Sequence, residues 1–257
     1  MNTKKTDLIY LNAVLCAMLL LVLANIELKK ILRIIVYISI YAVCILVSHI
    51  IHNASAAELK KAFALPSHIT LLCSTVYTAI TVINIFASCL FPMHSMNIEF
   101  SLYTAIFSGI VVPVFEEIFW RGCLCRSFIP FGTIPALIIP SVLFGLLHNG
   151  TAGLITATFA GIMFSYLYIL TGSLIPSIII HILNNTAGVL SVEYPIIALI
   201  IILSTIVVFI SSNIYYKIKN TQKPRLKLSC ESTVFKSLYI YLCLLIFTIL
   251  RIAGGLR

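Results

Sequence analysis

The chain has 257 residues, of which 61% are hydrophobic and only 10% are charged, and its mean hydropathy is +1.10. A soluble domain carries about 25% charged residues, so this composition excludes a soluble globular protein, and its high apolar content excludes a disordered one. We therefore predict an all-α polytopic membrane protein, a transmembrane bundle of roughly eight or nine helices of about 20 residues each.

Basic residues outnumber acidic ones, 17 to 8, which gives a net charge of +9. Most of them stand between apolar runs, as the positive-inside rule describes for cytoplasmic loops. The charge thus indicates membrane lipid rather than nucleic acid as the partner, and its distribution predicts a cytoplasmic N-terminus. We expect a prokaryotic plasma membrane. The eight cysteines lie mostly in apolar runs, where they act as small hydrophobes rather than as a disulfide framework.

Apolar runs alternate with short polar stretches along the whole chain. A short amphipathic helix at the membrane surface is predicted over residues 54–66, and Arg121 and Arg126 are expected in a cytoplasmic loop after the fourth span. We predict one membrane domain, 1–257, with a catalytic core 102–190, N-terminal helices 8–91, and C-terminal helices 195–252 with a basic loop 213–237. The predicted spans are 8–26, 34–51, 69–91, 102–120, 133–147, 152–170, 174–190, 195–215 and 238–252.

Two adjacent acidic residues, Glu116 and Glu117, lie near the end of the fourth predicted span. A charge at the bilayer centre costs at least about 2.5–3.5 kcal/mol on insertion scales, so such residues usually mark function. Glu117 precedes Arg121 by four residues and shares its helix face, whereas Glu116 projects about 100° away. The pattern predicts a neutralised Glu117 and a free Glu116 that can serve as general base. A structural ion pair near the interface is the alternative.

Further polar side chains interrupt two later apolar helices. His148 ends the fifth predicted span, and His181 and Asn185 share one face of the seventh. A carboxylate that takes a proton from water, imidazoles, and an amide that binds an oxyanion suffice for amide hydrolysis. Strict alternation of full spans would nevertheless place Glu116 and His148 at opposite membrane faces, so one of these spans is expected to be incomplete or wrongly bounded.

The order Glu-Glu-x-x-x-Arg, Phe-x-x-x-His and His-x-x-x-Asn on successive membrane helices resembles the CAAX protease and bacteriocin-processing family, over residues of about 107–190. The resemblance implies a helical bundle around an intramembrane catalytic cavity and a glutamate-dependent endopeptidase without a metal cofactor. It further implies that Glu116 activates water beside His148, that His181 and Asn185 form the oxyanion site, and that three residues support them: Glu117, Arg121 and Phe144.

Several alternatives stay open on the sequence. Glu116, His148 and His181 could hold zinc in a metalloprotease, since two histidines and one carboxylate form a known catalytic zinc set. Relatives in the family are also described as non-proteolytic self-immunity or scaffold proteins. A transporter is disfavoured because the chain shows no internal repeat. As substrates, the sequence allows a prenylated peptide, a bacteriocin-type peptide or a loop of another membrane protein.

Overall fold

The computed structural model describes residues 3–24, 26, 28–53, 55–66, 68–91, 102–148, 150–218 and 226–231. All regular structure in these residues is helical, which confirms the predicted all-α fold. The ninth predicted span, 238–252, lies outside the described residues. Five described helices are long and apolar enough to cross a membrane. They lie in α1 (Thr3–Ala24), α2 (Lys30–His52), α4 (Ile69–Leu90), α9 (Gly150–Thr171) and α11 (Pro195–Ile218), and two shorter apolar helices lie in α8 (Thr133–Leu146) and α10 (Ile175–Glu193).

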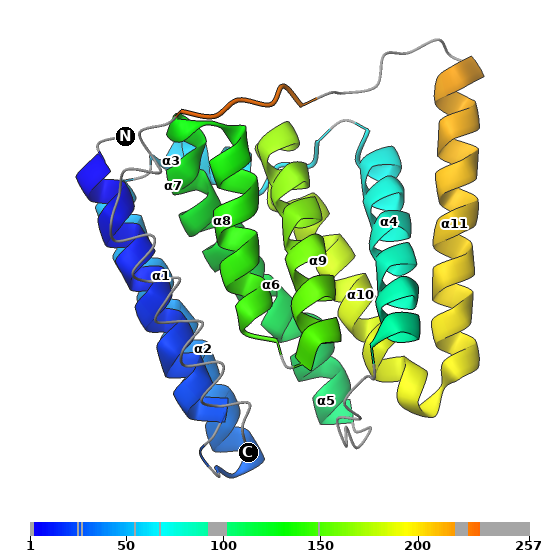
Figure 1. The fold of residues 1–257 in the computed structure, drawn as a ribbon, viewed down its shortest axis with the longest axis horizontal. Coiled ribbons are helices and arrows are strands. Elements are labelled where there is room, and N and C mark those ends of the chain that lie inside the picture. Colours follow the sequence, from blue (N-terminus) through cyan, green and yellow to red (C-terminus); the bar gives the residue numbers. More distant parts are fainter. Residues whose placement is uncertain are drawn as a thin grey trace.

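The helices lie side by side, with the α1–α2 pair at one edge of the bundle and α4 with α11 toward the other (Figure 1). Leucine, isoleucine and valine side chains cover the outer faces, and none of the apolar window of α11 is buried inside the protein. A large apolar surface of this kind needs lipid around it rather than water. The chain is thus an integral membrane protein, while the cytoplasmic location of its N-terminus stays a prediction.

The fourth span is longer than predicted. It continues past Trp120 through a helical run of changing pitch that ends only at Gly132, whose φ of 116° is a conformation suited to glycine. Arg121 was expected in a loop, and this expectation is wrong, because the residue is fully buried within the run. The parts are α5 (Leu102–Ile106), η1 (Phe107–Val111), α6 (Val112–Glu117), η2 (Ile118–Cys125), α7 (Arg126–Phe128) and η3 (Ile129–Phe131).

The next helix is short, which removes the conflict between Glu116 and His148. With 14 residues, α8 is roughly 21 Å long at 1.5 Å per residue, well below the ~30 Å of a bilayer core. It starts beside α7 at one end of the bundle and stops partway across it (Figure 1). The chain therefore turns at His148 inside the bundle, while Glu116 lies in the middle of its extended helical run.

Small residues let α8 and α9 approach closely. A Cβ on Gly145 would clash with the Thr158 hydroxyl and lie 3.0 Å from the Leu154 carbonyl oxygen. Close backbone contact through small residues stabilises membrane helix pairs.

We expect Gly145→Ala to destabilise the protein by about 1–3 kcal/mol, because the added methyl group overpacks this contact. The thermal midpoint of the purified protein should therefore fall by several degrees. Gly188→Ala is the control, because a Cβ there meets nothing within 4 Å; equal midpoints would contradict the close packing.

The surface helix predicted over 54–66 is present as α3 (Ala56–Ala62). It begins with a capping box: the Ser55 hydroxyl accepts from the Glu58 amide at 3.3 Å, and the Ser55 amide donates to the Glu58 carboxylate at 2.8 Å. The amide of Leu174, just before α10, donates to the Ala62 carbonyl at 2.7 Å. Arg126 forms an ion pair with Glu58 at 2.7 Å. These contacts hold α3 against the end of the bundle.

The capping box makes α3 sensitive to acid. The hydrogen bond from the Ser55 amide, and after it the charge of Arg126, lowers the pKa of Glu58 below its ordinary value of 4.5. The ionised carboxylate therefore stabilises α3 above pH 4.5, and this stabilisation is lost as the pH falls through the lower pKa of the folded protein. We expect the protection factors of the α3 amides, measured by NMR exchange relative to an unstructured peptide at the same pH, to fall on acidification below pH 4.5. Glu58→Gln should show low protection factors already at neutral pH, and Glu193→Gln should behave as the wild type. Protection factors in the wild type that do not change with pH would refute this role.

The described part of the basic loop has a defined place. Residues 226–231 form no helix, as predicted for this region. The Ile134 amide donates to the Ser229 carbonyl at 2.9 Å, and the Glu231 amide donates to the Phe131 carbonyl at 2.8 Å. These bonds satisfy an amide at the start of α8 and a carbonyl at the end of η3. The predicted beginning of the loop at residue 213 is too early, because α11 continues to Ile218.

Candidate active site

The two adjacent glutamates lie on α6, a short α-helical segment between two π-helical segments, η1 and η2. Pro113 stands at the start of α6, where its missing N–H leaves one helical hydrogen bond unmade. Wide π turns occur frequently at functional sites, because they rotate side chains away from the regular helical positions. The helical run is thus distorted next to Pro113, and Glu116 and Glu117 both end in the interior of the bundle, 9% and 0% exposed.

Glu117 and Arg121 form a fully buried ion pair, with Nη1 of the arginine 2.9 Å from Oε1 of the glutamate. The second guanidinium nitrogen donates to the Gly161 carbonyl at 3.1 Å. The guanidinium also lies over the rings of Phe144 and Phe164, 4.9 and 5.1 Å from their centroids, a favourable cation–π arrangement. The predicted pairing of Glu117 with Arg121 is confirmed, and α9 supplies part of its support.

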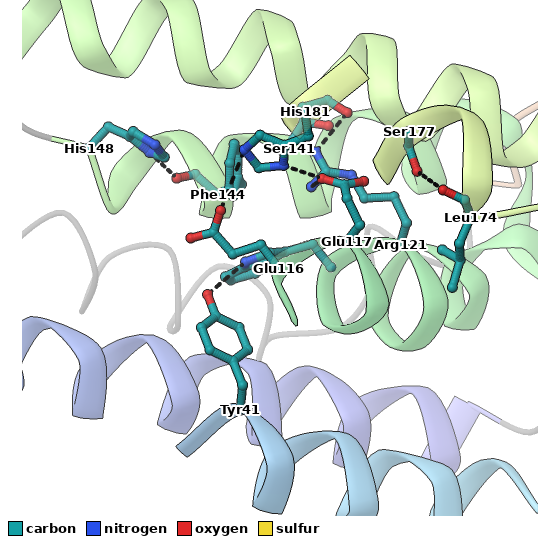
Figure 2. Close-up of polar contacts among 12 residues, drawn as sticks. Tyr41, Glu116, Glu117, Arg121, Ser141, Phe144, His148, Leu174, Ser177 and His181 are labelled. Atoms are coloured by element: carbon teal, nitrogen blue, oxygen red, sulfur yellow. Dashed lines mark hydrogen bonds and ion pairs between the residues drawn. The ribbon is translucent and has the colours of Figure 1, made fainter. Parts of the chain in front are cut away.

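His181 connects the two glutamates. Its Nδ1 lies 2.8 Å from Oε1 of Glu117, and its Nε2 faces Oε2 of Glu116 at 3.6 Å (Figure 2). Its ring stacks on Phe164 with a centroid distance of 4.8 Å. The cluster thus sets the Arg121 guanidinium and an imidazole against two carboxylates, and buried ionisable groups in a medium of low polarity need partners of this kind.

Glu116 differs from the sequence prediction in one respect. It was expected to be free, but its Oε1 accepts a hydrogen bond of 2.9 Å from the Tyr37 hydroxyl on α2. Its side chain keeps 12% of its surface exposed, whereas that of Glu117 is 0% exposed. Of the two carboxylates, Glu116 is therefore the one that solvent can reach.

His148 is joined to this cluster through Phe144. The His148 Nδ1 lies 3.0 Å from the Phe144 carbonyl oxygen. The Phe144 ring lies edge-on to both histidines, 4.8 Å from the His148 ring and 5.8 Å from the His181 ring (Figure 2). The structure thus brings the second motif to the same site as the first and the third, with Phe144 at its centre.

Asn185 has a different partner from the one expected. Its side-chain amide donates to the Ser108 carbonyl of η1 at 3.2 Å, and its Oδ1 accepts from Asn184 at 3.4 Å. Asn184 in turn accepts from Asn84 of α4 at 3.1 Å. The bonds of Asn185 tie α10 to the π-helical segment before the glutamates, and its part in an oxyanion site stays a prediction.

Sequence reasoning missed three contributors: the Tyr37 hydroxyl, the Phe164 ring and the Gly161 carbonyl. A sequence signal exists for the first, because Tyr37 and Tyr41 stand four residues apart on one face of an otherwise apolar span. No comparable signal marks Phe164 or Gly161, whose surroundings are ordinary for a membrane helix. Among the residues that the structure describes, no group of three or more His, Cys, Asp or Glu side chains is arranged to hold a metal. A metal-free reaction stays a prediction.

The fold and the site together define an integral membrane protein with a buried cluster of two glutamates, one histidine and one arginine. Residues 98–187 match the family model described as Type II CAAX prenyl endopeptidase Rce1-like, so this segment is similar to the domain of that family. The matched segment includes all three motifs, which confirms the resemblance seen in the sequence. No curated protein and no solved structure shows a significant match to the chain.

Proposed function

We propose that this protein is an intramembrane endopeptidase in which Glu116 activates the hydrolytic water. One observation carries the proposal: a partly accessible carboxylate lies beside a buried histidine whose other nitrogen is held by Glu117 and, through it, by Arg121. A general base needs access to water and a fixed orientation. Glu116 meets both requirements, whereas Glu117 has no exposed surface.

In the proposed reaction, water gives a proton to Oε2 of Glu116 as its oxygen bonds to the peptide carbonyl carbon. The electron pair of the carbonyl bond moves to the oxygen, which becomes an oxyanion. When this oxyanion collapses, the C–N bond breaks and the leaving nitrogen takes the proton from Glu116. His148 is proposed to orient the water, a role that rests on the family resemblance.

His181 is proposed to stabilise the oxyanion. Because Nδ1 is bonded to the Glu117 carboxylate, the ring is held in one orientation and Nε2 points toward Glu116. A protonated Nε2 can donate to an oxyanion formed next to Glu116, and donors fixed in advance contribute strongly to catalysis. The amide of Asn185 is proposed as the second donor, by resemblance to the family; in this role it would exchange its bond to Ser108 for one to the substrate.

As substrate, we propose a peptide that ends in a prenylated cysteine motif, because the matched family model is described as a CAAX prenyl endopeptidase. An apolar lipid chain suits a site inside a bundle of apolar helices, since each buried methylene contributes about 0.8 kcal/mol. The membrane itself and a peptide or lipidated peptide are thus the proposed partners. A bacteriocin-type peptide is the competing substrate.

The test uses the full chain in phospholipid nanodiscs and a fluorogenic peptide that carries a farnesylated cysteine. We expect the farnesylated peptide to be cut and the same peptide with an unmodified cysteine to be left intact. Equal cleavage of both, or cleavage of neither, would overturn the prenyl substrate. Stoichiometric zinc in the purified protein, together with loss of cleavage in a chelator, would overturn the metal-free mechanism.

A further inference from the structure

Tyr37 touches the proposed base although it lies far outside the segment that matches the protease family. It belongs to α2, whereas the match covers residues 98–187. Its hydroxyl donates to Oε1 of Glu116 at 2.9 Å, within the ordinary range of a hydrogen bond to a carboxylate. A hydrogen bond to a charged acceptor is among the strong ones in proteins.

The phenol ring has little freedom to move away from this position. It packs against Tyr41 at a centroid distance of 5.0 Å and edge-on against Phe107 of η1 at 5.6 Å. The α2 helix is itself fixed to α1, because the buried Asn12 amide donates to the Cys44 carbonyl at 2.7 Å and to the Ser48 hydroxyl at 2.9 Å. Buried polar bonds of this kind hold two membrane helices in one register.

The two oxygens of Glu116 consequently have different surroundings. Oε1 is occupied by the Tyr37 hydroxyl, and Oε2 lies 3.6 Å from Nε2 of His181. That separation is too long for a direct hydrogen bond, but a water oxygen can lie within hydrogen-bonding distance of both atoms. Only Oε2 combines an available lone pair with a position next to the proposed oxyanion donor.

We infer that Tyr37 is a positioning residue for the reaction: it holds Oε1 of Glu116 so that Oε2 faces His181 and receives the proton of the water. This inference rests on the proposed endopeptidase function. Tyr37 acts through Glu116 and contacts no reacting atom. Residues that the reaction needs then lie outside the matched segment, on α2, which α1 holds in place.

The first arm of the test compares Tyr37→Phe with Tyr77→Phe in the full chain. Tyr77 is a buried tyrosine of α4, only 2% exposed, in a different hydrophobic cluster. We expect Tyr37→Phe to lower kcat for the farnesylated reporter by about 10- to 100-fold, the effect of losing one hydrogen bond to a charged group. KM and the thermal midpoint should stay at their wild-type values. The Tyr77→Phe variant should keep wild-type kcat, and an unchanged kcat in Tyr37→Phe would overturn the inference.

The second arm needs no substrate, so its failure differs from a failure of the proposed function. Infrared difference spectra against Glu116→Gln identify the carboxylate or carboxyl band of Glu116 in the resting protein. Tyr37→Phe should shift this band, since its oxygen loses the phenol donor, and Tyr77→Phe should leave it unchanged. A shifted band supports the positioning role even if the wild-type chain leaves the reporter uncut, an outcome that would refute the proposed substrate. A band that does not move in Tyr37→Phe overturns the role of Tyr37.

Discussion

Glu116→Gln is expected to lower cleavage of the farnesylated reporter by about 10²- to 10⁴-fold, the usual contribution of a general base. Glutamine has nearly the shape of glutamate, and its amide oxygen can still accept the hydrogen bond that the Tyr37 hydroxyl gives to Glu116. It cannot take a proton from water at neutral pH. The substitution therefore removes the proposed chemistry and keeps the packing. Single-turnover rates in nanodiscs measure the effect.

The matched control for Glu116→Gln is Glu231→Gln. Glu231 is exposed, and its recorded contact with Phe131 is made by the backbone amide. The same change of side chain at this position should leave the rate unchanged. Glu116→Gln should also retain a wild-type thermal midpoint, because the side chain keeps a hydrogen-bonding oxygen and loses a charge that burial disfavours. Near wild-type cleavage by Glu116→Gln would show that another group activates the water.

The order and place of the helices within the described residues could be predicted from hydropathy alone, but not which of them are long enough to cross a membrane. A run of about 20 apolar residues has few alternatives to a membrane helix, and the predicted spans from 8–26 to 195–215 all correspond to helices. The boundary after Trp120 could not be predicted in this way. Arg121 indicates a loop on any transfer scale, yet it is buried, because Glu117 and the Gly161 carbonyl accept from its two terminal nitrogens and two aromatic rings lie against its guanidinium.

The site was predictable where its members lie close together in sequence. The spacing of Glu117 and Arg121 sets their contact within one helix turn. The contacts of His181 with both glutamates cross between α10 and α6, so they depend on how the helices pack. Tyr37 and Glu116 are 79 positions apart, and no local pattern relates them. The joint position of Glu116 and His148 likewise depends on the early end of α8, which hydropathy did not fix.

Arg121→Leu is expected to be the most destabilising of the substitutions considered. It leaves the Glu117 carboxylate, whose side chain is 0% exposed, without its cationic partner, and it releases the Gly161 carbonyl. Breaking one side of a buried ion pair costs about 3–5 kcal/mol. For a chain of this size that corresponds to a fall of roughly 6–20 °C in the thermal midpoint. Thermal unfolding in detergent, followed by the near-ultraviolet signal of Trp120, measures this fall.

Arg126→Leu is the control, because it removes the same side chain from the same helical run. Arg126 pairs with Glu58, whose side chain is 52% exposed, and exposed pairs contribute only about 0–1 kcal/mol. The double variant Glu117→Met/Arg121→Leu should be more stable than Arg121→Leu alone, since no uncompensated carboxylate is left in the bundle. Additive losses in the double variant would mean that packing, rather than charge pairing, is the main contribution of Arg121. Equal midpoints for Arg121→Leu and Arg126→Leu would contradict the buried ion pair itself.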